Sequence, residues 1–398
     1  MDPAEGRRER GRYRSLGCRL AERSAAASRL TILFAFIKSH RQMSHNHSQP
    51  DLAWPERWPH RVAVLLVGLT FPLIWVGGLV TSYDAGMAVP DWPSTYGYNL
   101  FLYPWQTWLF GPFDILVEHG HRLLASLVGF ITIALLVSIW KCSTSPALRV
   151  CGVIALGLVV GQGVLGGMRV LFDERDLAKV HGCVGPLFFA FTCFLATFTS
   201  RRWRETQSTT RSADSSAAVD NRLFRFAALT AGWAYLQIAL GAQLRHLTPD
   251  VAPGAFRALL LFHLVVAAIV TSHLIWLAIK TRRATRNLTS PETSAWLTRP
   301  TRALVLLVVT QLTLGAATWV LNYGFPIWFR DYAWAQDFVI QHESFRQALV
   351  STAHVAIGAL IFALSTVVAA RVWRTLPATS NAAVLAISLT SNSFEVAR

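Results

Sequence analysis

The chain has 398 residues, of which 53% are hydrophobic and only 15% are charged. A soluble domain carries about 25% charged residues, so this composition excludes an ordinary water-soluble protein. The formal net charge of +15 does not indicate a nucleic-acid partner. The lysines and arginines are concentrated before the first apolar run and in alternate loops, which is the pattern of membrane topology.

Apolar runs of about 20 residues, each long enough to cross a hydrocarbon layer of about 30 Å, recur along the chain. They lie at residues 62–82, 120–140, 150–168, 181–200, 223–243, 257–279, 302–322 and 350–372. The sequence therefore predicts an all-α polytopic membrane protein with eight transmembrane helices. No lysine or arginine occurs between Arg61 and Arg122, so the positive-inside rule puts that loop outside and both termini in the cytoplasm.

Two tails flank the predicted spans, at residues 1–61 and 373–398. The arginine- and serine-rich stretch 1–42 fits three interpretations: a targeting segment, an amphipathic surface helix, or a start assigned too early, with translation beginning at Met43. We assign no chemistry to it.

A short motif is repeated at the ends of the odd-numbered spans: WVGGLVT (75–81), VLGGMRV (164–170), ALGAQLR (239–245) and TLGAATW (313–319). Small residues let membrane helices approach closely, and we expect the glycines to serve this packing. In the last three motifs a glutamine lies one helical turn before the first glycine, at Gln162, Gln237 and Gln311. The repeat predicts two pseudo-symmetric four-helix bundles, at 62–200 and 223–372, joined by a cytoplasmic linker at 201–222.

Each even-numbered span carries a histidine near its outer end, at His121, His181, His263 and His354. Any one of them alone is most simply a hydrogen-bonded packing residue. Four at equivalent positions of a repeat point to function. Zinc or copper needs three or four convergent ligands, whereas two facing histidines in each bundle suit axial ligation of haem iron. We therefore predict two haem sites.

Only the first predicted site has an acid beside it. Glu118 precedes His121 by three residues and shares its helix face, whereas Glu343 precedes His354 by eleven. A carboxylate there can orient an imidazole or move protons, although a first-turn glutamate also suits the helix dipole. Arg122 is expected to meet a haem propionate or to extend to the interface, and His119 does not share the face of His121. This asymmetry predicts one haem that is acted upon and one that carries electrons.

Five stretches together resemble the haem A synthase family over roughly residues 62–372: GGLVTSYDAGMAVPDWP, EHGHRLLASLVG, GGMRVLFDERDLAKVHG, FHLVVAAIV and TAHVAIGAL. The resemblance implies that haem O is the substrate and that its C8 methyl group is oxidised to a formyl group by successive hydroxylations, which gives haem A for terminal oxidases. It implies that His121 and His181 flank the substrate haem, with Glu118 as the catalytic residue. It also implies that His263 and His354 hold a resident haem b. Some members carry cysteine pairs in outside loops, which are missing from 83–117 and 244–256.

Two other classes of protein remain open at this point. A diheme b-type electron carrier, for example a quinol-linked membrane subunit, needs the histidines but not Glu118. A haem-handling transporter of cytochrome c maturation would carry a clustered tryptophan motif, which is missing. The partners expected for a haem A synthase are an electron donor, haem O synthase, terminal oxidase subunits, membrane lipid and a second copy of the chain. We expect a bacterial cytoplasmic membrane, with an organelle inner membrane as the alternative.

Overall fold

The computed structural model describes residues 57–212, 219–248, 250–286, 288, 290–329, 331–342 and 344–376. Within these residues eight helices are long and apolar enough to cross a membrane. They are α2 (Trp58–Ser82), α4 (Phe113–Cys142), α5 (Pro146–Leu171), α6 (Arg175–Phe198), α8 (Asn221–Arg245), α9 (Pro253–Ala284), α10 (Pro291–Tyr323) and α12 (Phe345–Thr375). The described part of the chain contains no β-strand beyond one isolated bridge. The predicted polytopic all-α fold is confirmed.

Most of the helices extend past the apolar runs that predicted them, because hydrogen-bond caps rather than hydropathy set where a helix begins. Ser145, Asp220, Ser290 and Ser344 each accept a backbone N–H of the first turn. Helix α4 begins at Phe113, seven residues before the predicted span. His121 therefore lies about two turns inside its helix and not at its end.

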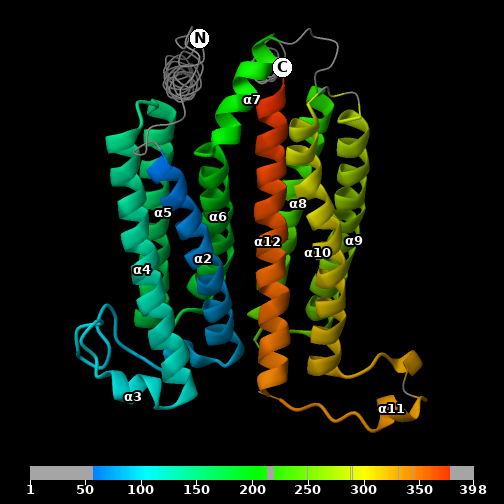
Figure 1. Cartoon of the computed structure of the whole chain (residues 1–398). Helices are drawn as coiled ribbons and strands as arrows, with labels where there is room; N and C mark the ends of the chain where they lie inside the picture. Colours follow the sequence, from blue (N-terminus) through cyan, green and yellow to red (C-terminus); the bar gives the residue numbers. More distant parts are fainter. Residues whose placement is uncertain are drawn as a thin grey trace, which may run out of the picture.

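The eight helices form two groups of four (Figure 1). In the first group, α2, α4, α5 and α6 pack as a closed ring, and in the second α8, α9, α10 and α12 do the same. Many outward side chains are apolar and exposed, for example Leu306 and Phe262. Outward apolar surface of this kind is what a lipid environment requires.

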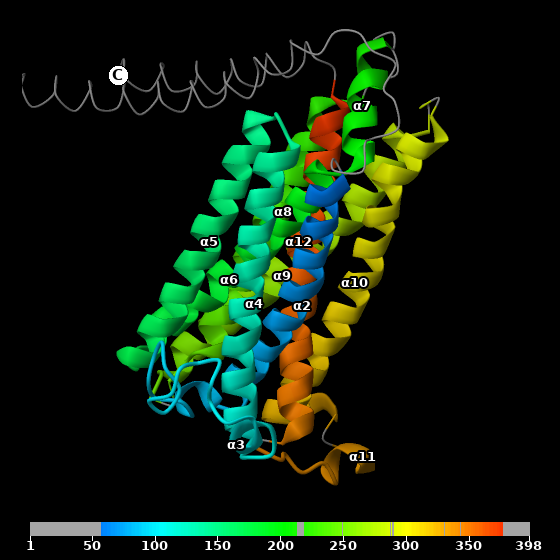
Figure 2. The same ribbon diagram turned by 60° about the vertical axis from the view of Figure 1, so that its left-hand side comes forward.

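Helix α12 belongs to the second group but also packs against α2 and α6 of the first (Figures 1 and 2). At this contact the Ser82 and Thr352 hydroxyls lie 3.0 Å apart. A Cβ atom added to Gly78 would lie 2.6 Å from Thr352 Cγ2, so glycine is needed for the close approach of α2 and α12. Arg245 of α8 donates to Gly78 O and Ser82 Oγ, each at 2.6 Å. These bonds join the two groups.

The short helices divide between the two ends of the bundle (Figure 1). One end, here called the loop end, carries η2 (Ala85–Met87), α3 (Trp105–Leu109), η4 (Ile327–Phe329) and α11 (Ala333–Gln336). The other end carries α7 (Arg201–Ser212), the start of α2 and the end of α12. Helix α7 lies within the predicted linker. The stretch 1–42, Met43, Glu343 and residues 377–398 lie outside the described residues.

The α2–α12 contact gives a stability prediction. Gly78→Ala should destabilise the protein by about 1–3 kcal/mol, because the new methyl group overlaps Thr352 Cγ2. Adding Thr352→Ser should recover most of the loss, since it removes Cγ2 and keeps a hydroxyl for Ser82. Thermal unfolding in detergent measures both variants. Equal melting temperatures for wild type and Gly78→Ala would show that the two helices are not packed this closely.

Candidate functional site: two histidine pairs

The structure brings the four histidines together as two pairs. His121 of α4 faces His181 of α6, and the ring centroids are 6.4 Å apart. His263 of α9 faces His354 of α12, again with 6.4 Å between ring centroids. Each pair lies inside one four-helix group, between its second and fourth helices.

This spacing fits one iron between two imidazoles. With each metal–nitrogen bond about 2.0 Å long and each ring centre about 1.1 Å beyond its nitrogen, the ring centres lie about 6.2 Å apart. The Nδ1 atoms of all four histidines are buried and have no hydrogen-bond partner among the described residues. Buried polar atoms without partners cost free energy. Among those residues no group of three or more His, Cys, Asp or Glu side chains forms a metal cluster, so the donor set is two imidazoles per site.

Each histidine ring packs on a glycine of the preceding membrane-spanning helix. A Cβ added to Gly77 would lie 2.9 Å from Cε1 of His121, and one on Gly166 would lie 3.0 Å from Cε1 of His181. The same distances are 3.4 Å for Gly241 and His263, and 3.1 Å for Gly315 and His354. These are the first glycines of the four repeated motifs. The repeat therefore encodes space for four imidazole rings, which is more specific than the helix packing expected of it.

The repeated glutamines also contact the histidines. Gln162 donates to the carbonyl oxygen of His181 at 2.8 Å. The side-chain nitrogen of Gln237 lies 3.0 Å from Nε2 of His263, and that of Gln311 lies 3.5 Å from Nε2 of His354. The first motif has Leu73 at the corresponding position, so His121 is the one histidine of the four without this neighbour.

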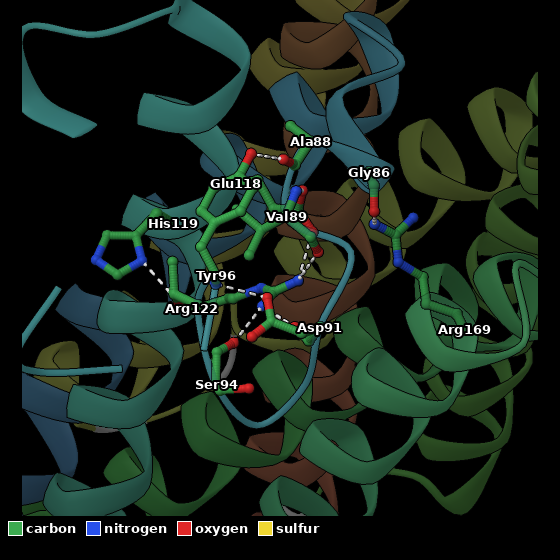
Figure 3. A network of polar contacts seen from close by, with 11 residues as sticks. Gly86, Ala88, Val89, Asp91, Ser94, Tyr96, Glu118, His119, Arg122 and Arg169 are labelled. Atoms are coloured by element: carbon green, nitrogen blue, oxygen red, sulfur yellow. Dashed lines mark hydrogen bonds and ion pairs between the residues drawn. The ribbon is translucent and has the colours of Figure 1, made fainter. Parts of the chain in front are cut away.

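Glu118 and Arg122 form an ion pair near the start of α4, with 2.8 Å between Nη2 and Oε1 (Figure 3). Glu118 is 2% exposed, and its Oε2 accepts the Val89 N–H at 2.7 Å. Arg122 also donates to the carbonyl oxygens of Val89, Asp91 and Ser94. Both side chains thus bind the loop between α2 and α4. The predicted contact of Arg122 with a haem propionate would have to share this guanidinium.

His119 also binds this loop, although no role was predicted for it. It is 1% exposed, and its Nδ1 lies 3.2 Å from the Thr95 hydroxyl oxygen. The rings of Tyr103 and Trp108 pack on it, with centroids 5.2 and 5.1 Å away. The signal in the sequence was the density of aromatic residues in the loop.

The loop itself is held in a defined turn. Asp91 accepts the N–H groups of Tyr96 and Gly97 at 2.7 and 2.9 Å, and Gly97 has φ +77°, which favours glycine. Burial raises the pKa of Asp91, but hydrogen bonds from Gly97, Ser94 and Tyr96 outweigh it, so the pKa lies below its ordinary value. The carboxylate therefore stabilises the turn above the pKa of an unfolded aspartate, and this contribution is lost as the pH falls through the folded pKa.

Helix α5 fixes the near end of the loop. Arg169 donates to Gly86 O at 2.8 Å (Figure 3), and a Cβ on Gly86 would lie 2.3 Å from the Arg169 guanidinium. The Trp92 ring lies against Gly167, where a Cβ would be 2.3 Å from ring atoms. The loop between α2 and α4 therefore covers the loop end of the first group. In the second group no arginine follows His263 or His354, because Leu264 and Val355 stand there.

Comparisons with known proteins agree with this architecture. Residues 60–252 match the family model described as cytochrome oxidase assembly protein. Over this half the chain is similar to the haem A synthase family. It is 26% identical to a heme A synthase of Shouchella clausii over 184 residues, which is 45% of this chain and 56% of that protein. It is 30% identical to a heme A synthase of Symbiobacterium thermophilum over 197 residues, or 48% and 58% of the two lengths.

The matched part thus covers little more than half the length of each relative. The family match includes Glu118, His121, Arg122 and His181, and it ends before His263 and His354. For the second half of the chain, the pairing of the histidines rests on the repeated geometry.

The glycine–histidine contact can be tested at the first pair. Gly77→Ala should displace the His121 ring, because the new methyl group would lie 2.9 Å from Cε1. We expect haem bound at the first pair to lose its six-coordinate low-spin absorption spectrum, while the second pair keeps it.

Gly68→Ala is the matched control on the same helix, since a Cβ there meets nothing within 4 Å. It should leave both signals unchanged. If Gly77→Ala behaves like Gly68→Ala, the glycine does not position the ring.

Proposed function

We propose that this protein is a haem A synthase, which oxidises the C8 methyl group of haem O to a formyl group by successive hydroxylations and so supplies haem A to terminal oxidases. The observation that carries the proposal is the presence of two histidine pairs at the same spacing, of which only the first lies beside a buried acid and under an anchored loop. Similarity to the family supports it.

The two pairs are given different roles. His121 and His181 would hold the substrate haem O, and His263 and His354 would hold a resident haem b through its iron. When bound, haem b supplies one-electron transfer. The protein's own contribution is to fix the four ring planes through the backing glycines and to exclude water from the first pair with the loop between α2 and α4.

Glu118 is the proposed catalytic residue at the first pair. It lies three residues before His121, on the same side of α4. Val89 N–H and the Arg122 guanidinium each donate one hydrogen bond to the Glu118 carboxylate. Further lone pairs remain free on its two oxygens. The carboxylate can therefore accept a proton at Oε1 or Oε2 without leaving its place, while the ion pair with Arg122 holds it there.

Arg122 then acts as the residue that positions Glu118 and the loop. Its guanidinium contacts three backbone carbonyls and one carboxylate, so its charge is already balanced. A haem propionate at Arg122, as predicted from the sequence, would share the guanidinium with these groups.

The second candidate, a diheme b-type electron carrier, would use the same histidine pairs. It gives no reason for a buried glutamate at one pair only, and the similarity to the haem A synthase family does not favour it. The protein is an integral multi-pass membrane protein. We propose a bacterial cytoplasmic membrane with both termini in the cytoplasm. Haem O synthase, terminal oxidase subunits and an electron donor are its proposed partners.

Product analysis separates the two candidate functions. The chain is expressed with a supply of haem O under oxygen, and the extracted haems are separated by chromatography. Wild type should yield hydroxylated haem O or haem A. Haem b alone, with reversible reduction intact, would favour the electron carrier.

Two variants separate catalysis by Glu118 from anchoring of the loop. Glu118→Gln keeps an acceptor for Val89 but cannot take up a proton, so we expect at least a hundredfold loss of product, in line with general acid–base catalysis. Arg122→Gln weakens the anchoring and should cost less, about tenfold. Equal losses in both variants would assign Glu118 to the loop alone.

A further inference from the structure

Two arginines at the loop end lie close to the histidine pairs and form no ion pair with an acid among the described residues. Arg169 is three residues beyond Gly166, the glycine behind His181, and Arg245 is four residues beyond Gly241, the glycine behind His263. Offsets of three and four residues keep each arginine on roughly the same helix face as its glycine, about one turn nearer the loop end.

Both arginines are partly buried, and their hydrogen bonds go to neutral atoms. Arg169 donates to Gly86 O. Arg245 donates to Gly78 O and Ser82 Oγ. Within the described residues neither forms an ion pair. Arg122, by contrast, has Glu118.

His246, the residue after Arg245, lies among several cations. Burial and the cations Arg245, Lys179, Arg169 and Arg175 lower the pKa of His246 to about 4, so this histidine is neutral near pH 7. Lys179 is the one member of this set with an acidic partner among the described residues, Asp176. Glu118, Asp84 and Asp173 act electrostatically on Arg169, although none of them forms an ion pair with it within the described residues.

The two arginines also lie near different histidine pairs. Arg169 follows the glycine that contacts His181, and Arg245 follows the glycine that contacts His263. A partly buried guanidinium without a counter-charge is costly in a membrane protein unless an anion completes it. Each histidine pair thus has one such cation on its loop-end side.

We propose that Arg169 and Arg245 are the carboxylate receptors of the two haem sites, with Arg169 binding a propionate of the haem at the first pair and Arg245 a propionate of the haem at the second. This inference rests on the proposed function, because it takes haem as the ligand. Arginine suits the task, since its planar fork matches a carboxylate bidentately. Arg245 would also connect the occupied second site to α2, through its bonds to Gly78 and Ser82.

Binding of haem b and of its dimethyl ester tests the proposal, because the ester lacks both carboxylates. The purified full chain in uncharged detergent is stripped of haem, and each compound is titrated by absorbance. His121→Ala leaves the second pair as the one to measure, and His263→Ala leaves the first. Each site should bind the free acid at least about tenfold more tightly than the ester, as expected for hydrogen bonds to charged groups.

Arg245→Gln should remove this preference at the second pair and leave it at the first, and Arg169→Gln should do the reverse. Arg245→Lys, which keeps the charge, should retain part of it. Arg225→Gln removes an exposed charge from the opposite end of α8 and should change nothing. The proposal is overturned if the preference for the free acid survives both Gln variants. It is also overturned if wild type binds the acid and the ester equally. Either result would fit arginines that bind lipid phosphate. Failure of wild type to bind either compound would instead contradict the proposed function.

Discussion

The contact between an imidazole ring and the backbone of a glycine occurs four times in this protein, and the arrangement of the two candidate sites depends on it. At Gly77, Gly166 and Gly315 a side chain would crowd the histidine ring, and at Gly241 it would be in ordinary contact with the ring. Interiors are close-packed, so a ring held on one side by a helix backbone has little freedom. Two rings held in this way on facing helices keep a fixed separation, and a ligand between them needs no rearrangement of the helices. Gly78, the second glycine of the first motif, lets α2 approach α12 closely at Thr352. This contact connects the two groups.

The difference between the two sites arises from polar groups that only the first half contains. Glu118, His119 and Arg122 lie within little more than one turn of α4, and all three bind the loop between α2 and α4. Burying an ion pair rarely adds stability by itself. Here the pair also satisfies the backbone N–H and carbonyl groups of a loop that folds over the bundle, which would otherwise lack partners. The first histidine pair thus lies in a group whose loop is held by these polar contacts, and different chemistry at two similar histidine pairs becomes feasible.

Much of the fold follows from the sequence because hydropathy reports directly on membrane insertion. The apolar runs predict the eight spans, and the internal repeat predicts the four equivalent histidines. They do not predict the helix ends, since caps such as Ser145 and Ser290 lie outside the apolar runs. The role of Gly77 or Gly166 required knowing which residue lies opposite on another helix. The loop contacts of Arg122 and His119 depend on the path of a loop, which periodicity does not describe. The contact of Arg122 with a haem propionate stays a prediction.

The proposed function depends most directly on the pairing of the histidines. Haem stoichiometry in histidine variants tests this pairing. Haem per chain and the low-spin electron paramagnetic resonance signals are measured for single and double His→Ala variants of the purified protein. We predict that His121→Ala and His181→Ala abolish the same signal, and that the double variant loses nothing more. Combining His121→Ala with His354→Ala should abolish both signals. The pairing is contradicted if the His121/His181 double variant loses both signals, or if the His121/His354 double variant keeps one.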